Sequence, residues 1–245
     1  MDTYVGGATS RFADRVLRLL ELVEHRCATT RAEKEAVYRL RYDAYIRQRL
    51  IEPRADGRLY DKAFDDAPNA WITTTFVDGE IASTFRIHVA ADETGALPSL
   101  GVFSDVITPH LRMGLVVVDP TRLAARLEIS RRFPETPYIA LRPAWLAAEY
   151  FQADFVIATI HQEHQAFYRR VFGYAPWSEP RDYPNVNCKI LCMGLDFRAA
   201  KERVEARYPF FRSTRAERNA LFDRPAPVRT AQPIFPEDEL RVPAE

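Results

Sequence analysis

The sequence predicts a mixed α/β fold, in which a central mixed sheet carries helices on both of its faces. Residues 71–89 have the pattern of a β-hairpin, because β-branched and aromatic residues alternate on both sides of the turn pair Asp78-Gly79. Residues 154–160 form a short, unbroken, β-branched run, which is typical of a strand buried on both faces. Helical patterns precede and follow that run, so we expect strand–helix–strand connections in the second half of the chain.

Two helical patterns lie before the hairpin. Residues 11–25 have apolar spacing that fits a helix alone or a helix followed by a strand. Residues 29–49 are the clearer helix, because Thr30 and Glu33 form a capping box at its start. The apolar stripe of this helix, which we expect to face the sheet, consists of Ala36, Val37, Leu40 and Ala44.

The second half alternates strands and helices. A strand is predicted over residues 114–120, and we expect Pro120 to stop it because proline has no N–H group for the ladder. Residues 121–133 then have the pattern of a helix. Gly173 is expected to end a helix over residues 164–174 in a left-handed conformation. The other predicted elements are a helix over 137–152, a strand over 187–197 and a helix over 198–208.

Length and composition favour a globular protein with one large domain. The chain of 245 residues is 47% hydrophobic and 28% charged, which fits a substantial core. We expect a single domain over residues 1–223 and a proline-rich tail over residues 224–245 that extends along the surface. Lys+Arg and Asp+Glu both number 34, a balance that argues against a general nucleic-acid binder and a polybasic membrane anchor.

The cysteine count and the apolar segments indicate the compartment. Three cysteines are an odd and low number, which fits a reducing environment without a disulfide framework. No stretch reaches the ~20 apolar residues of a membrane span. The N-terminus has neither the basic start nor the apolar core of a secretory signal. We therefore expect a cytoplasmic protein with no transmembrane segment.

Residue types that bind metals occur in two places, and neither predicts a metal site. Cys188 and Cys192 lie on one face of a predicted strand, where core packing explains them better than a zinc site without further ligands. His161 and His164 share a helix face, but Glu163 lies on another face and no carboxylate completes the set. The prediction is therefore that no metal is bound.

Charged residues in the first half point to a polar site. Arg41 lies on the apolar stripe of its helix, and a buried guanidinium needs a partner because an unpaired buried charge is costly. Arg86 lies in the centre of a hairpin strand, where an arginine needs a carboxylate or an anionic ligand. Asp61, Asp65 and Asp66 lie on the loop before the hairpin and are the candidate partners. A structural ion pair and a solvated aspartate-rich loop are the alternatives.

Two segments after the hairpin also carry charges. Asp119 and Arg122 lie at and just past the end of the buried strand that Pro120 is expected to stop, and Glu128 and Arg131 follow in the next segment. No Gly-x-Ser-x-Gly elbow supports a catalytic serine. No Gly-x-Gly-x-x-Gly or Walker sequence occurs, and nine glycines leave little room for phosphate-binding loops.

The segment 154–174 resembles the end of a Gcn5-related N-acyltransferase domain, whose late helix often carries Asn-x-x-Ala-x-x-x-Tyr-x-x-x-Gly-Phe. His161 occupies the position of the asparagine, Tyr168 that of the tyrosine, and Gly173-Tyr174 that of the Gly-Phe pair. The resemblance implies the fold of that family, a central mixed sheet flanked by helices. It also implies that Tyr168 protonates the leaving thiolate.

The first half resembles the N-acyl amino acid synthases of the long-chain N-acyltyrosine synthase type, which are related to acyl-homoserine-lactone synthases. The resemblance rests on "VYRLRYDAY", "YDKAFDDAPN" and "DGEIASTFRIHV", continues through "VVDPTRLAA", "ETPYIALR", "EHQAFYRRVFGY" and "YPNV", and covers roughly residues 20–195. In these families an arginine of the first main helix, aspartates before a hairpin and an arginine of the next strand line the site. Arg41, Asp65 and Arg86 match those positions, with Tyr45 and Asp61 as neighbouring substrate-binding candidates.

The chain departs from these families in two ways. Asp119-Pro-Thr-Arg122 and Glu128-Ile-Ser-Arg131 compete for the Glu-x-Ser-Arg position of the lactone synthases, and we favour the first pair because it adjoins the strand. The usual acetyl-CoA loop, Gln/Arg-x-x-Gly-x-Gly/Ala, is missing, although its backbone N–H groups normally bind pyrophosphate. Its absence favours an acyl-carrier-protein thioester of phosphopantetheine over acyl-CoA as the co-substrate.

The resemblance implies an N-acyltransferase with no bound cofactor, which moves a fatty acyl group from the thioester to the amine of an amino acid or similar small amine. Asp65 is the candidate for deprotonating the ammonium group, Arg41 or Arg86 for binding the carboxylate, and backbone N–H groups for stabilising the oxyanion. Two alternatives are open: a lactone synthase that uses S-adenosylmethionine, and a non-catalytic acyl-binding or partner-binding domain.

Overall fold

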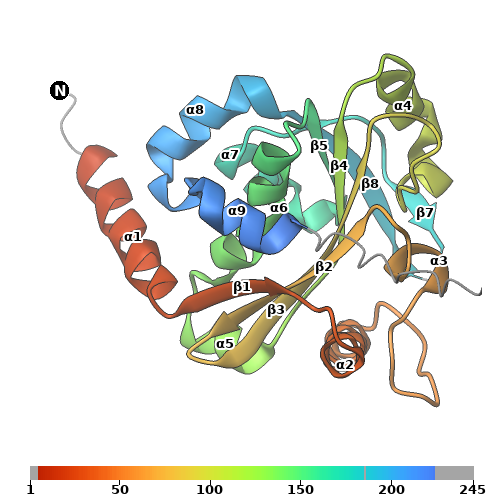
Figure 1. Cartoon of the computed structure of the whole chain (residues 1–245), viewed down its shortest axis with the longest axis horizontal. Coiled ribbons are helices and arrows are strands. Elements are labelled where there is room, and N and C mark those ends of the chain that lie inside the picture. The colour runs from red at the N-terminus through yellow and green to blue at the C-terminus, as the bar shows by residue number, and fades with distance from the viewer. Residues whose placement is uncertain (1–4, 185, 224–245) are drawn as a thin grey trace, which may run out of the picture.

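A twisted sheet passes through the middle of the molecule and positions its other elements (Figure 1). The computed structural model describes residues 5–184 and 186–223, so the predicted tail, residues 224–245, lies outside the described part. Over these residues the sheet has eight strands in the order β1-β2-β3-β4-β5-β8-β6, and β7 pairs with β8. The strands are β1 (Val23–Cys27), β2 (Ala70–Val77), β3 (Glu80–Ala90), β4 (Val117–Ala125), β5 (Phe155–His161), β6 (Ala175–Pro176), β7 (Arg181–Tyr183) and β8 (Val186–Asp196).

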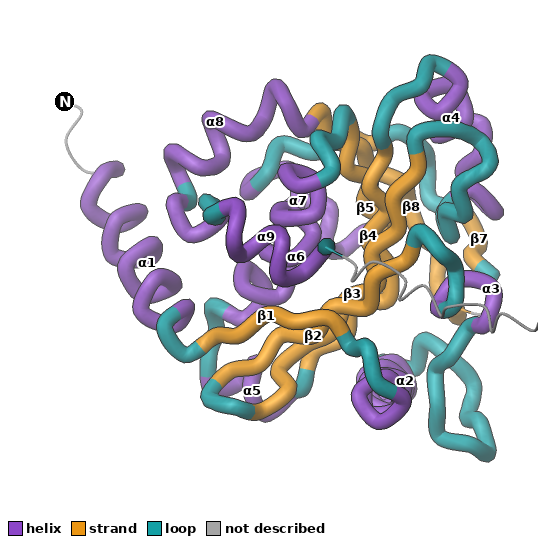
Figure 2. The backbone as a smooth tube through the Cα atoms, in the orientation of Figure 1, coloured by secondary structure: helices purple, strands orange, loops and turns teal. Residues whose placement is uncertain are grey.

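Helices cover both faces of this sheet. One face is covered by α1, α6, α7, α8 and α9, whereas α2, α3 and α4 lie on the other side (Figure 2). The helices are α1 (Val5–Leu20), α2 (Arg31–Arg47), α3 (Lys62–Asp65), α4 (Leu100–Arg112), α5 (Leu127–Arg132), α6 (Thr136–Tyr150), α7 (Gln165–Val171), α8 (Phe197–Arg207) and α9 (Arg215–Phe222), with short 3-10 helices η1 (Gln162–His164) and η2 (Pro209–Phe211). The predicted fold class, a mixed sheet with helices on both faces, is confirmed.

The largest part of the core lies between the sheet and α6. Ten consecutive residues of α6, from residue 139 to residue 148, are buried. Apart from Arg142 these ten residues are apolar, and α6 is enclosed by the sheet on one side and by α1 and α9 on others. A smaller cluster packs α4 against the opposite face through Phe103, Ile107 and Leu111.

The sheet opens between β4 and β5. These strands are parallel, and they pair only at Val117 with Phe155 and at Val118 with Val156. Beyond this point each strand pairs only with its other neighbour: β4 with antiparallel β3, and β5 with antiparallel β8. The two central strands therefore part toward their carboxyl ends, the place where an α/β sheet commonly binds its ligand.

Several local predictions are confirmed. The hairpin turns at Asp78 and Gly79, both with positive φ, as a two-residue turn requires. The Thr30 hydroxyl accepts the Glu33 N–H group at 3.2 Å, and the Glu33 carboxylate accepts the Thr30 N–H group at 2.9 Å, which completes the capping box. Residues 11–25 form a helix followed by the start of β1, the second of the two alternatives.

The predicted end of the strand at Pro120 is wrong. Strand β4 continues through Pro120 to Ala125, and only Leu127–Arg132 of the predicted helix 121–133 is helical. The edge of β4 that faces β5 is unpaired beyond Val118, so a missing N–H group on that edge removes no ladder bond. Asp119 and Arg122 therefore lie within the strand rather than after it.

Helices α4 and α9 lack a counterpart among the sequence predictions, as do the short elements α3, β6 and β7. Helix α4 contains Pro109 and a kink at Phe103, where φ is −120° and ψ is 28°, and these interruptions weaken its helical pattern. Helix α9 is short, although Thr214 and Glu217 form a capping box at its start. Across residues 5–184 and 186–223, no helix is both long and apolar enough to cross a membrane.

Candidate active site

A cavity of about 1250 Å³ lies where β4 and β5 part. Residues 120–125 of β4 and residues 156–161 of β5 all line it. Because successive side chains of a strand point to opposite faces, both faces of these strands border the cavity, which therefore passes through the sheet. Its volume exceeds the ~300–1,000 Å³ of a typical small-molecule pocket, so it has room for two reactants.

One end of the cavity is polar and lies on the side of α2 and α3. Tyr45 of α2, Asp61 and Phe64 border this end, together with Arg86 of β3 and Arg122 of β4. Asp61 is the N-cap residue of α3, but its carboxylate accepts no hydrogen bond from that helix. The carboxylate is therefore free of the capping role that aspartates at this position usually have.

Behind this polar end, two arginines share one buried carboxylate. Arg41 Nη1 donates to Asp65 Oδ1 at 2.7 Å, and Arg86 Nη1 lies 3.4 Å from the same oxygen. The Asp61 N–H group donates to Asp65 Oδ2 at 2.8 Å. The Arg41 side chain is 0% exposed and the Asp65 side chain 1%. Two positive charges against one negative charge leave an excess of positive charge at this end of the cavity.

Asp65 and its neighbours satisfy only some of the hydrogen-bond donors of Arg41 and Arg86. Within the described residues, Arg41 Nε and Nη2 have no hydrogen-bond partner, nor has Arg86 Nη1, although these atoms are buried. Arg86 Nε donates to the Thr121 hydroxyl at 3.2 Å, and its guanidinium lies 5.4 Å from the centre of the Phe64 ring. Arg86 thus keeps hydrogen-bonding capacity for an anionic ligand while its position is fixed.

These contacts set the protonation states. Burial alone would raise the pKa of Asp65, but the Arg41 and Arg86 guanidiniums outweigh it and hold this pKa below its usual value. Burial lowers the pKa of Arg86 to about 10, against the attraction of Asp65, so Arg86 remains charged at neutral pH. Burial and the charge of Arg86 lower the pKa of His88 to about 3, so its neutral ring donates through Nε2 to the Phe64 carbonyl oxygen.

Arg122 is the second cation of the polar end. It lies half-buried in the cavity wall, and no described carboxylate is within ion-pairing distance of it. Its guanidinium lies 5.7 Å from the centre of the Tyr45 ring. The backbone at Arg122 has a φ of 57°, a costly conformation for a residue other than glycine, and such strain is concentrated at functional sites.

Asp119 is buried in β4 and does not line the cavity. Its carboxylate accepts the Ser99 N–H group at 3.0 Å and the Ser99 hydroxyl at 2.8 Å, and so holds the start of α4. Burial raises its pKa to about 6, although the Ser99 hydrogen bonds oppose the shift. Of the competing pair, Glu128 and Arg131 are exposed and do not line the cavity either.

Helix α7 carries Tyr168 into the cavity wall. Gly173 ends the helix with a φ of 88°, as predicted, and its N–H group donates to the carbonyl oxygens of Tyr168 and Arg169. The Tyr168 ring meets the Tyr174 ring edge-on at 5.4 Å, and Tyr174 also lines the cavity. Burial raises the pKa of both phenols, so both are protonated at neutral pH.

The other end of the cavity is apolar and lies on the side of α6 and α7. Small residues of α6 and β5 leave the space, and aromatic and branched residues enclose it. The residues at this end are Phe85, Ala140, Leu141, Ala144, Trp145, Val156, Ala158 and Phe172.

The structure separates the predicted site residues into two groups. Five of them line the cavity, and three lie behind it. The first group is Tyr45, Asp61, Arg86, Arg122 and Tyr168, and the second is Arg41, Asp65 and Asp119.

Residues outside the predicted set also border the cavity. His161 and His164, which the sequence interpretation set aside as a metal pair, line it near the end of β5, and so does Cys188. Ala140 and Ala144 of α6 could have been recognised from the sequence as cavity residues, because two small residues one helical turn apart leave space beside a helix. Among the described residues, no three His, Cys, Asp or Glu side chains lie close enough to hold a metal ion.

Comparisons with known proteins agree with this geometry. The family model of the N-acyl amino acid synthase FeeM matches residues 36–196. The solved structure of FeeM from uncultured soil microbes has a TM-score of 0.61 and 17% identity, over 75% of this chain and 97% of that chain. No protein with a curated description matches this chain significantly.

Two acyl-homoserine lactone synthases also share the fold. MesI, a CoA-dependent enzyme, has a TM-score of 0.53 and 18% identity, over 76% of this chain and 95% of that chain. LasI has a TM-score of 0.53 and 13% identity, over 73% of this chain and 92% of that chain. The family match covers more than half of the chain, so this protein is an acyltransferase that belongs to the FeeM family of N-acyl amino acid synthases.

Proposed function

We propose that this protein transfers a fatty acyl group from a carrier-protein thioester to the amine of an amino acid. The observation that carries the proposal is the cavity through the sheet, which has a cationic end and an apolar end. An acyl chain fits the apolar end between α6 and β5, and a small zwitterion fits the polar end between α2 and β3. The thioester carbon then lies between the parted strands, where both reactants meet.

The acceptor binds through its carboxylate. Arg86 and Arg122 both border the polar end, and Asp65 neutralises only part of the charge that Arg41 and Arg86 bring. A carboxylate at this place pairs with guanidinium groups whose donors are already in position. Asp65 acts as a positioning residue for Arg86 in this proposal, because its two oxygens are engaged and its carboxylate does not line the cavity.

The acceptor's ammonium group has to lose a proton before it attacks the thioester. Asp61 is the carboxylate that borders the polar end without an ion pair to a described cation, so it receives or orients the ammonium group. Backbone N–H groups on the unpaired edges of β4 and β5 stabilise the oxyanion that forms. Burial keeps the proton on the Tyr168 phenol, which donates it to the departing thiolate, and the phenolate then takes up the second proton that the acceptor nitrogen loses as the amide forms.

An acyl-carrier protein is the proposed donor. Residues 120–137 contain no glycine, so a glycine-rich pyrophosphate loop of the kind that binds CoA is lacking after β4. Exposed arginines gather at one rim of the cavity: Arg47 and Arg49 line it, and Arg126 lies beside the lining residue Leu127. The Arg47 Nη2 donates to the Ala125 carbonyl oxygen at 3.3 Å, which brings the end of α2 to the end of β4. A cationic rim favours docking of an acidic carrier domain.

The test supplies matched palmitoyl thioesters of acyl-carrier protein and of CoA to the purified protein, with a mixture of amino acids and, in a parallel reaction, with S-adenosylmethionine. Mass spectrometry then identifies the products. We expect N-palmitoyl amino acids, formed faster from the carrier-protein thioester. Faster turnover of the CoA thioester would contradict the proposed donor. Binding of either thioester without any N-acyl product would support a non-catalytic domain, and a lactone formed from S-adenosylmethionine would indicate a lactone synthase.

A variant pair tests the acid. Tyr168→Phe removes the phenol proton and leaves the ring, so kcat should fall at least about 100-fold with little change in KM. Tyr174→Phe is the matched control, because it removes a neighbouring phenol of the same cavity wall. A full loss with Tyr174→Phe and none with Tyr168→Phe would assign the role to Tyr174 instead.

A further inference from the structure

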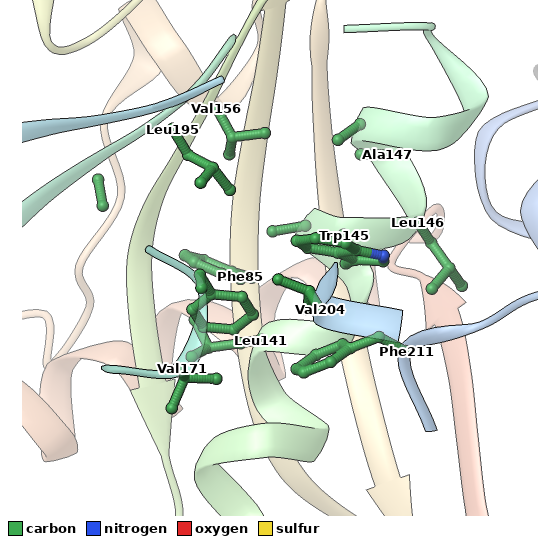
Figure 3. Packing of buried hydrophobic residues seen from close by; sticks show 14 of the residues in the cluster. Phe85, Leu141, Trp145, Leu146, Ala147, Val156, Val171, Leu195, Val204 and Phe211 are labelled. Carbon is green, nitrogen blue, oxygen red and sulfur yellow. The ribbon is translucent and has the colours of Figure 1, made fainter. Parts of the chain in front are cut away.

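Two stacked aromatic rings close the apolar end of the cavity. Trp145 of α6 and Phe172 after α7 both line the cavity, and their ring centres lie 5.8 Å apart with an interplanar angle of 28°. Phe211 contacts both rings from behind, at 5.5 Å from Trp145 and 5.1 Å from Phe172, and it does not line the cavity. Figure 3 shows Phe211 beside Trp145 in the packed core. The stacked pair therefore separates the cavity from the core.

The indole ring of Trp145 is held in one position by two residues of α8, a helix that lies later in the chain. Its Nε1 donates to Glu205 Oε1 of α8 at 3.2 Å, and Phe197 at the start of α8 meets the ring edge-on at 4.8 Å. A tryptophan with a satisfied N–H group and aromatic neighbours keeps one orientation. The ring cannot turn out of the way of a longer ligand without breaking these contacts.

The elements behind the wall are themselves tied to α6. Arg142, which is 5% exposed, donates through Nε to the Phe210 carbonyl oxygen at 2.8 Å. Its Nη2 donates to the Arg212 carbonyl oxygen at 2.9 Å and to Glu217 Oε1 at 2.8 Å. One buried arginine thus holds η2 and the start of α9 against the helix that carries Trp145.

The partners that Trp145, Phe172 and Arg142 contact behind the wall lie beyond the segment that the FeeM family model matches, which ends at residue 196. Helices α8, η2 and α9 begin at Phe197 and continue to Phe222. The segment 197–222 therefore lies outside the part of the chain that the family model matches, and it packs directly behind the acyl end of the cavity.

We propose that the segment 197–222 sets the longest acyl chain that this enzyme accepts, by holding Trp145 and Phe172 as the end wall of the cavity. This inference rests on the proposed acyl transfer. Ala140 and Ala144 of α6 leave room for the acyl chain in the apolar end of the cavity. The rings of Trp145 and Phe172 limit how far the acyl chain can extend. Loosening the wall lengthens the accepted chain, and filling the space beside Ala144 shortens it.

The experiment measures acyl-chain preference in two independent ways. Saturated carrier-protein thioesters from octanoyl to eicosanoyl compete in one reaction, and mass spectrometry gives the chain-length distribution of the N-acyl products. The matching free fatty acids also displace a fluorescent fatty acid from the protein, which reports binding without turnover. Circular dichroism and thermal unfolding check that each variant is folded.

Four variants define the role of the wall. Trp145→Leu should shift both distributions toward longer chains, with about a fourfold gain in relative preference for each methylene that gains room. Phe211→Leu, which does not touch the cavity, should shift them in the same direction by less. Ala144→Leu should shift them toward shorter chains. Trp177→Leu is the control, because this tryptophan packs on His110 and Phe155, away from the cavity and outside the segment 197–222.

The outcomes separate this inference from the proposed function. Unchanged distributions in folded Phe211→Leu and Trp145→Leu would overturn the role of the wall. A shift with Trp145→Leu but none with Phe211→Leu would overturn the role of the segment 197–222. A shift in fatty-acid binding without any N-acyl product would support the wall while the proposed acyl transfer fails.

Discussion

The two ends of the cavity are held by different forces. At the polar end, Arg41, Asp65 and Arg86 form one buried ionic unit whose members depend on each other's charge. At the apolar end, Trp145 and Phe172 are held by ring contacts with residues from several helices. Each contact of the second kind contributes little alone, and the sum is large.

This difference indicates which end of the cavity tolerates amino-acid substitutions. Removing one member of a buried ion pair leaves an uncompensated charge, so the unit of Arg41, Asp65 and Arg86 tolerates almost no substitution. Volume-conserving changes in an apolar wall usually cost less than about 1.5 kcal/mol. We therefore expect acceptor binding to constrain the sequence strictly and acyl length to be adjustable. Three substitutions of charged residues test the electrostatic side of this comparison, in order of expected effect.

The largest effect is expected for Asp65→Asn. It leaves the buried Arg41 and Arg86 guanidiniums without their anion, so the free energy of unfolding should fall by about 3–5 kcal/mol. Urea denaturation measures the change. Asp66→Asn is the matched control, because the neighbouring aspartate is exposed and should cost less than about 1 kcal/mol. Equal losses in the two variants would show that the ionic unit does not hold the polar end together.

The pH dependence of stability should distinguish Asp119 from Asp65. Because burial raises the pKa of Asp119 from 3.8 to about 6, the folded state holds this proton more tightly than the unfolded state. The resulting stability is complete below about pH 4 and is lost as the pH rises through about 6. Asp65, whose pKa is lowered, has the opposite sign: its contribution is present above the ordinary carboxyl pKa and lost on acidification.

Asp119→Asn removes the titration. Urea denaturation of the wild type and the variant at pH 4 and pH 7 gives two stability differences. The difference should move in favour of the variant by about 2.4 kcal/mol between these pH values, at ~1.36 kcal/mol for each pKa unit. Parallel pH dependence of the two proteins would contradict a raised pKa at Asp119.

The smallest effect is expected for Arg122→Ala. If Arg122 binds the acceptor carboxylate, its loss should raise KM for the amino acid about tenfold, or ~1.4 kcal/mol, with stability nearly unchanged. Arg126→Ala is the control, since Arg126 is an exposed cation nearby that does not line the cavity. The same rise in KM for both variants would show a general charge effect instead of a contact.

Local chemistry made much of the fold predictable. A capping box at Thr30, a turn pair at Asp78-Gly79 and a left-handed Gly173 each act over a few residues, and each prediction is confirmed. The predicted strand end at Pro120 was wrong, because the cost of a proline in a strand depends on whether the adjacent strand edge is paired. That pairing is a property of the whole sheet. Helix α4 was not predicted, because its helical pattern is interrupted at Phe103 and Pro109.

The candidate site also has a part that the sequence predicts and a part that only the folded structure shows. The sequence pattern alone identified an arginine on an apolar helix stripe, aspartates before the hairpin and an arginine in its centre, because buried charges need partners. It could not show that Asp65 turns both oxygens to the protein, whereas Asp61 and Arg122 face the cavity. That outcome depends on how far β4 and β5 part and on how residues distant in the chain pack around the gap. Only the assembled fold brings the aromatic residues of α6, α7 and the segment 197–222 together at the closed end, since their contacts span long distances along the chain.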